Sequence, residues 1–95
     1  MTHVVAEIRY RAPAEEVAAV RPEHRRHLQD QHARGLLVLS GPWADGTGAC
    51  LVYRVEEEGT PAQERVRALL ETDPFRREGL VDVVSVRAWT VVVGA

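Results

Sequence analysis

The order of the periodic segments constrains this sequence more than any other feature. Segments with the two-residue alternation of strands and segments with the 3.6-residue spacing of helices follow one another as strand, helix, strand, strand, helix, strand. The strands are expected at residues 3–10, 36–40, 49–56 and 80–92, and the helices at residues 13–34 and 61–72. This order predicts an α+β fold, a ferredoxin-like βαββαβ protomer in which two helices cover one face of a four-stranded antiparallel sheet.

Turn and capping residues set the expected boundaries. The stretch GPWADGTG, residues 41–48, supplies turn residues between the two strands of a hairpin. Thr60 is expected to be the N-cap of the second helix, with Pro61 in the first helical position. That helix should end near Thr72, because Pro74 disfavours the helical conformation in the residue before it. A short turn should then lead into the last strand.

The last strand lacks a polar side. A sheet with one face in water shows cleaner alternation, and no helix of this chain is left to cover a second face. We therefore expect another copy of the chain to cover it, in a homodimer or a higher homo-oligomer. The two sets of alternating side chains are Val84, Val86 and Ala88 on one side, and Val81, Val83, Trp89 and Val91 on the other.

Composition limits the class of protein. The 95 residues are enough for one small domain, expected to span residues 1–95, and 45% of them are hydrophobic, so the chain should fold. A net charge of -2 argues against a nucleic-acid partner. No apolar run reaches the ~20 residues of a membrane span, and the first residues lack the apolar segment of a signal peptide. With Cys50 as the only cysteine, we expect a cytoplasmic protein without an internal disulfide.

The first helix holds three of the four histidines, and helical phase separates them. At about 100° per residue, one stripe faces the sheet, with His24 at its centre. His27 and His32 flank the stripe, whereas Arg25 and Gln29 lie toward the solvent. The stripe consists of Val17, Val20, His24, Leu28 and Gln31.

A buried histidine needs a hydrogen-bond partner, because an unmet polar group costs about 1–3 kcal/mol. Asp73 is the leading candidate, since extending the apolar stripe of the second helix by one turn places it in the same layer as His24. Asp73 precedes a proline and could equally be the N-cap of the following turn. The two roles are compatible, because a carboxylate has two oxygens.

Other site chemistries have weaker support. His24 and His27 lie three residues apart, but no CxxC or HExxH motif accompanies them, and we expect neither a metal nor another cofactor. Cys50 falls in mid-strand, where a lone cysteine is usually an inert thiol. Ser40 ends a strand beside a Gly-Pro turn, so its hydroxyl could line a pocket or make a turn hydrogen bond.

Several short motifs occur in an order and at a spacing that resemble the YciI-like (YCII-related) family, over roughly residues 3 to 90. This resemblance implies a dimeric α+β barrel and small enzymes with a His-Asp pair, which would fall on His24 and Asp73. One branch of the family is associated with dechlorination of hydroxylated chloroaromatic rings. The motifs are R-x-x-H-x-x-x-L-x-x-x-x-x-x-G from Arg21 to Gly35, the strand ending in Ser40-Gly41-Pro42, Asp73-Pro74-Phe75, and Gly79-Leu80 before a valine-rich strand reaching Trp89.

The chain departs from the family at Gln31, which stands where an apolar residue is usual and is expected to widen or wet the pocket. Because no clear nucleophile accompanies the pair, it favours proton-transfer chemistry of the isomerase or lyase type on a small, aromatic or enolisable molecule. Arg21, Ser40 and Phe75 are the expected substrate contacts. The alternative is a ligand-binding or accessory homodimer in which the pair is a structural lock. A cavity that exposes the imidazole would favour the enzyme.

Overall fold

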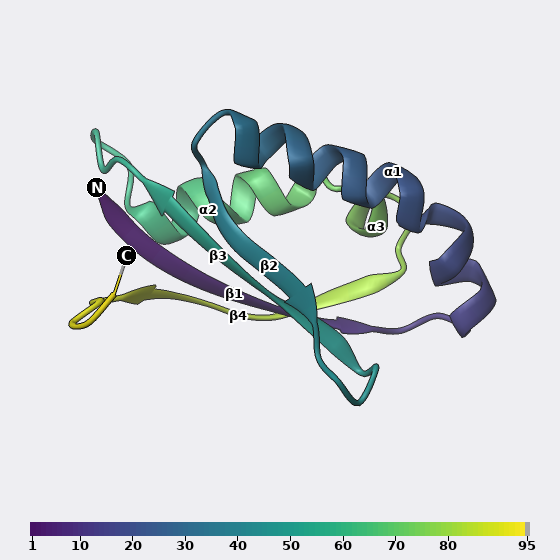
Figure 1. The fold of residues 1–95 in the computed structure, drawn as a ribbon. Helices are drawn as coiled ribbons and strands as arrows, with labels where there is room; N and C mark the ends of the chain where they lie inside the picture. Colours follow the sequence, from purple (N-terminus) through teal and green to yellow (C-terminus); the bar gives the residue numbers. More distant parts are fainter. Residues whose placement is uncertain (95) are drawn as a thin grey trace.

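The computed structural model describes residues 1–94 and has the predicted ferredoxin-like α+β fold, with the helical turn after the second helix as an added element (Figure 1). Four antiparallel strands form one sheet in the order β2-β3-β1-β4. Along the chain the elements are β1 (Thr2–Tyr10), α1 (Ala14–Ala33), β2 (Leu37–Pro42), β3 (Gly48–Val55), α2 (Ala62–Glu71), α3 (Pro74–Arg77) and β4 (Val81–Trp89).

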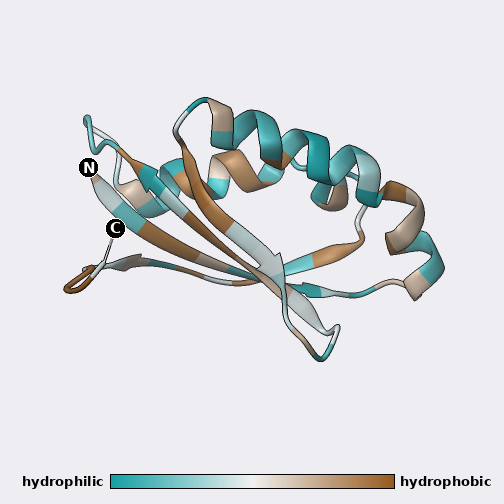
Figure 2. Ribbon diagram, in the orientation of Figure 1, coloured by the Kyte–Doolittle hydropathy of each residue, from teal (hydrophilic) through white to brown (hydrophobic). Residues whose placement is uncertain are grey.

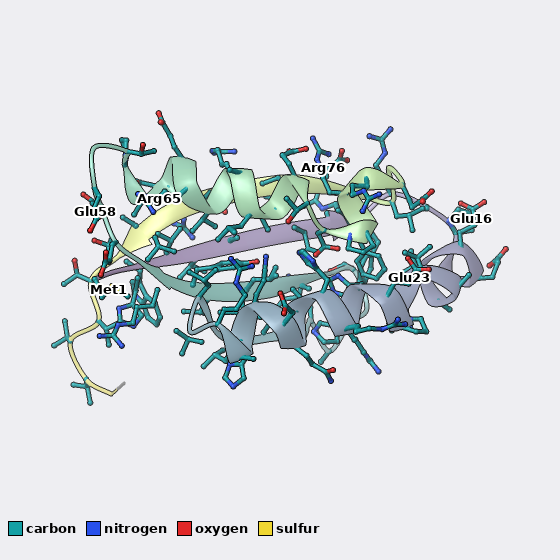
Figure 3. All side chains as sticks on the ribbon, turned by 90° about the horizontal axis from the view of Figure 1, so that it is seen from above. Met1, Glu16, Glu23, Glu58, Arg65 and Arg76 are labelled. Atoms are coloured by element: carbon teal, nitrogen blue, oxygen red, sulfur yellow. The ribbon has the colours of Figure 1, made fainter. Side chains whose placement is uncertain are left out.

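The helices form a single layer over one face of the sheet. Viewed from above, α1 and α2 lie side by side (Figure 3), with α2 packed on β1, β3 and β4, and α1 on β2 and α3. The aliphatic core lies between these layers, whereas α1 is hydrophilic along most of its outer surface (Figure 2). None of the helices within residues 1–94 is long and apolar enough to span a membrane.

Two predicted boundaries are wrong. The second helix begins at Ala62 with Pro61 as its N-cap residue, and no side chain caps it, so Thr60 does not have the predicted role. Strand β2 continues through Gly41 and Pro42, which were expected in the turn. Proline is tolerated there because β2 is an edge strand, where one side of the backbone needs no ladder hydrogen bond.

The predicted division of the last strand into two faces is also wrong. Ile8 pairs with Val83 and Glu7 pairs with Ser85, which leaves Val84 as an extra residue at a β-bulge. The bulge reverses the alternation, so valines on both sides of it share the helix-covered face. That face of β4 holds Val81, Val83 and Val86, and the strand ends at Trp89 rather than at residue 92. The opposite face of β4 is therefore mostly polar.

Strands β1 and β3 approach each other closely at Gly48. A Cβ added there would lie 2.0 Å from the carbonyl oxygen of Ile8 and 3.0 Å from the Cα of Arg9. Both neighbours are backbone atoms of a central strand, so they cannot move aside as a flexible side chain would. The absence of a side chain at this position is therefore a condition of the β1–β3 pairing.

We expect Gly48→Ala to lower the free energy of unfolding by about 1–3 kcal/mol, the usual cost of overpacking. Urea denaturation would measure it. Gly41→Ala is the matched control, because a Cβ on this glycine of β2 would meet nothing within 4 Å. Similar losses in the two variants would contradict the steric explanation.

Candidate active site

His24 and Asp73 form a buried hydrogen-bonded pair between the middle of α1 and the end of α2. The Nδ1 atom of His24 lies 2.8 Å from Oδ1 and 2.9 Å from Oδ2 of Asp73. The residues are 7% and 4% exposed. Helical phase thus correctly predicted that the two side chains meet, although they lie 49 positions apart in the sequence.

Local structure holds both partners in place. Asp73 is the N-cap of α3, and its Oδ1 accepts a hydrogen bond of 2.8 Å from the backbone N–H of Phe75. The Phe75 ring stacks on the His24 imidazole, with ring centroids 3.8 Å apart and an interplanar angle of 10°. The capping role and the histidine partnership predicted for Asp73 therefore occur together, and they restrict the rotation of the imidazole from two sides.

The arrangement determines which nitrogen of His24 is available for chemistry. An ionised carboxylate only accepts hydrogen bonds, so the Nδ1 atom must carry a proton and donate it. In the neutral imidazole, Nε2 is then unprotonated and can accept a proton. Within residues 1–94, Nε2 makes no hydrogen bond.

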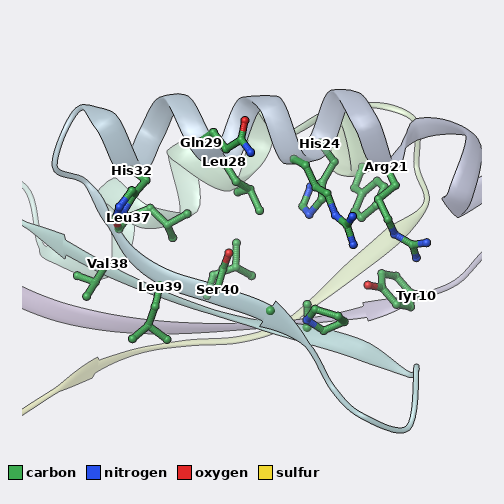
Figure 4. Close-up of a pocket in the computed structure, with 16 residues that line it drawn as sticks. Tyr10, Arg21, His24, Leu28, Gln29, His32, Leu37, Val38, Leu39 and Ser40 are labelled. Carbon is green, nitrogen blue, oxygen red and sulfur yellow. The ribbon is translucent and has the colours of Figure 1, made fainter.

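A cavity of about 490 Å³ opens beside His24, between α1 and the edge strand β2 (Figure 4). Arg21, Ser40 and Phe75, the predicted substrate contacts, all contribute to its wall together with His24. Asp73 lies behind the imidazole and does not line it. The volume falls within the ~300–1,000 Å³ that is usual for small-molecule sites.

Sequence reasoning missed three polar residues of α1 that line this cavity. Arg25 and Gln29 were expected in solvent, and His32 was placed beside the stripe without a role, yet all three line the wall. Tyr10 also lines it and meets Phe75 edge-on, with centroids 6.0 Å apart. Helical phase could have indicated the missed residues of α1, because the cavity faces the flank of this helix rather than the centre of its apolar stripe.

Gln31 does not widen the cavity, contrary to expectation. It is 1% exposed and lies behind the site, where its Oε1 accepts a hydrogen bond of 2.8 Å from the Tyr53 hydroxyl. Burial and, to a lesser degree, the charge of Asp73 raise the pKa of this hydroxyl well above its usual value. Tyr53 therefore stays neutral and remains a hydrogen-bond donor. Gln31 also donates to Nε2 of His27, 3.2 Å away, and the same nitrogen lies 3.2 Å from the Thr72 hydroxyl, so His27 is on the flank of α1 that faces the end of α2.

The alternative chemistries find little geometric support. Within residues 1–94, no three His, Cys, Asp or Glu side chains gather closely enough to hold a metal ion. Burial, and then the charge of Glu7, raise the pKa of the Cys50 thiol. Cys50 pairs with Glu7 on the sheet face away from the cavity, so it is not placed to attack a molecule bound beside His24.

Comparisons with known proteins found one matching family model and a solved structure of similar fold. The family model for the YCII-related domain matches residues 1–90. Among solved structures, the 5-chloro-2-hydroxyhydroquinone dehydrochlorinase of Burkholderia phenoliruptrix, in complex with 2,5-dihydroxybenzoquinone, is similar in fold, with a TM-score of 0.65 and 20% sequence identity. The match covers 99% of this chain and 96% of that chain. No curated protein sequence matches the chain.

Proposed function

This chain belongs to the YCII-related domain family, and on that premise we propose that it is a small-molecule enzyme that uses His24 and Asp73 for proton transfer. One observation carries the proposal: an imidazole whose Nδ1 is held by a buried carboxylate lines a cavity of small-molecule size. A purely structural lock needs no cavity beside the ring. The reaction class is a lyase or an isomerase acting on a small aromatic or enolisable molecule.

The chain supplies the parts of an acid–base reaction. The Nε2 atom of His24 takes a proton from a carbon next to a carbonyl or enol, and Asp73 keeps the ring in the required tautomer. The electron pair left by the proton forms a new double bond. In an elimination this expels a leaving group such as chloride, and in an isomerisation the proton returns to another carbon. Arg21, on the cavity wall, holds the oxygen on which negative charge develops.

Acyl transfer has less support than proton transfer. Ser40 lines the cavity but makes no side-chain hydrogen bond within the described residues, so no base activates it as a nucleophile. The dehydrochlorinase of similar fold supports a lyase, because its named reaction removes a proton and a chloride from a hydroxylated ring.

The proposal is tested by incubating the protein in D₂O with chlorinated dihydroxybenzenes and trihydroxybenzenes and with enolisable keto acids. Chloride release and deuterium incorporation at carbon would be followed by ion chromatography and NMR. We expect at least one compound to exchange or lose chloride faster than in buffer, and the effect to vanish in His24→Gln. Equal rates for the wild type and this variant on every responsive compound would contradict the proposal.

We further propose that the open sheet face forms a homodimer. The apolar residues of this face come from β1, β2 and β3 rather than from β4. Leu39, Val52 and Val5 form a row across β2, β3 and β1. Leu39 is 61% exposed and Trp89 is 51% exposed on this side. No helix within residues 1–94 covers it, so a second copy is the partner that would bury the row in both subunits.

Equilibrium sedimentation would test the dimer. We expect a stable dimer at micromolar concentration, because burying the exposed tryptophan and leucine of this face stabilises a domain with a small core. Leu39→Glu should shift the equilibrium to the monomer, since a charge would then be buried in the interface. A wild-type monomer at the same concentration would refute the proposal.

A further inference from the structure

The charges around the cavity have one sign. The chain holds 14 acidic and 12 basic residues, yet no Asp or Glu within residues 1–94 lines the cavity. Arg21 and Arg25 both line it, and within residues 1–94 neither makes an ion pair or a side-chain hydrogen bond. Two unpaired guanidinium groups beside a largely apolar wall attract an anion and repel a cation.

A second histidine lines the cavity in the same tautomeric state as His24. The Nδ1 atom of His32 lies 2.8 Å from the carbonyl oxygen of Leu37. A carbonyl only accepts, so Nδ1 carries the proton and donates it. The Nε2 atom makes no hydrogen bond within residues 1–94 and is left for a bound molecule. Within the part of the chain that the structure describes, His32 lacks the carboxylate partner that His24 has, which suits it to hydrogen bonding rather than to proton abstraction.

The two histidines lie at different points along the cavity. They are eight residues apart on α1, which corresponds to about 12 Å along the helix axis. Leu28 lies between them (Figure 4), and Leu37 and Leu51 add to the apolar wall. Arg21 precedes His24 by one turn and Arg25 follows it directly, and both arginines lie on the side of α1 that lines the cavity. A ligand that reaches both ends therefore needs a charged group, an apolar middle and a second polar group.

We propose that the cavity binds an elongated organic anion, with its charged group at Arg21 and Arg25 and a second hydrogen-bonding oxygen at His32. The inference rests on the proposed function in taking this cavity as the substrate site. In this proposal His32 determines specificity, because only a molecule longer than a single hydroxylated ring reaches it from Arg21 and Arg25.

Four related compounds test this by NMR titration of the wild-type protein. The reference is 4-hydroxycinnamate, in which a ring and a vinyl group separate the carboxylate from the hydroxyl. Cinnamate lacks the hydroxyl, 4-hydroxycinnamamide lacks the charge, and 4-hydroxybenzoate is shorter. We expect the reference to bind most tightly and each analogue about fivefold to tenfold more weakly, the loss for one hydrogen bond or charge contact. Equal affinities, or no shifts at millimolar concentrations, would overturn the proposal.

Variants then assign the contacts. His32→Phe should lower the affinity for 4-hydroxycinnamate to that for cinnamate, and leave the affinity for cinnamate unchanged. Arg25→Gln should weaken both acids and not the amide. His27→Phe is the control, because His27 is on the same helix but outside the cavity. If His32→Phe weakens both acids equally, His32 has no role at the distal end. Binding requires no turnover, so failure of the enzymatic proposal would leave these results interpretable: His24→Gln should still bind the reference.

Discussion

Replacing His24 with alanine is expected to lower the rate of proton transfer by about 10²–10⁴-fold, the range that general acid–base groups contribute. Among the described residues, His24 is the one that both lines the cavity and has a carboxylate hydrogen-bonded to its imidazole. Steady-state kinetics on any compound that responds in the D₂O assay would measure the loss. His27→Ala, one turn along the helix and outside the cavity, should retain most of the activity.

A drop in stability alone could imitate this result, so a second variant is needed. Alanine leaves the Asp73 carboxylate, which is 4% exposed, with the Phe75 N–H as its only partner among the described residues. That loss is expected to cost about 1–3 kcal/mol. His24→Gln can still donate an amide N–H toward Asp73 but cannot take up a proton. Loss of activity in both variants, with the fold largely preserved in the second, identifies a catalytic group. If His24→Gln remains active, the pair is a structural lock.

The sequence predicted the pair because two simple periodicities meet in it. A helix that packs on a sheet must present one stripe to it, and His24 is at the centre of that stripe. Asp73 follows from the same argument applied to the second helix, with Pro74 marking where the chain must turn. These inferences need only the geometry of one helix at a time, which is why they could be made without coordinates.

The cavity could not be predicted in the same way, because its position depends on how α1 sits relative to β2. Apart from His24, its helical residues lie between about 40° and 140° from His24 around the axis, and of these only Arg21 was expected to contact a substrate. Arg25 and His32 fall in this sector, and Gln31 and His27 fall on the other side of the stripe. The cavity therefore opens on the flank above the edge strand, where a gap between the layers remains unfilled.

The last strand shows a second limit of prediction from the sequence. Alternation in the sequence assumes an unbroken two-residue period, and one extra residue at Val84 reverses the faces beyond it. Nothing in a run of valines signals where such a residue will be inserted. The bulge is decided by the pairing with β1, which is a contact between distant parts of the chain.

Asp73→Asn is expected to lower activity by up to about 10⁴-fold with little loss of stability, as the same change does in Ser-His-Asp triads. Asparagine is as good an N-cap as aspartate, so the bond from the Phe75 N–H and the start of α3 should survive. Its amide can donate to Nδ1 of His24, which places the proton on Nε2. An imidazole in that tautomer cannot accept a proton from the substrate.

The tautomer is directly measurable, and it separates the explanations. In ¹⁵N-labelled protein, the ring nitrogen shifts of His24 should show Nε2 unprotonated in the wild type and protonated in Asp73→Asn. Asp73→Ala removes the cap as well as the partner, so its free energy of unfolding should fall by about 0.5–2 kcal/mol more. If Asp73→Asn loses activity while the tautomer is unchanged, orientation through Asp73 is not the cause. If the tautomer changes and activity persists, His24 does not act as the base, and the reaction must draw its proton acceptor from another residue of the cavity.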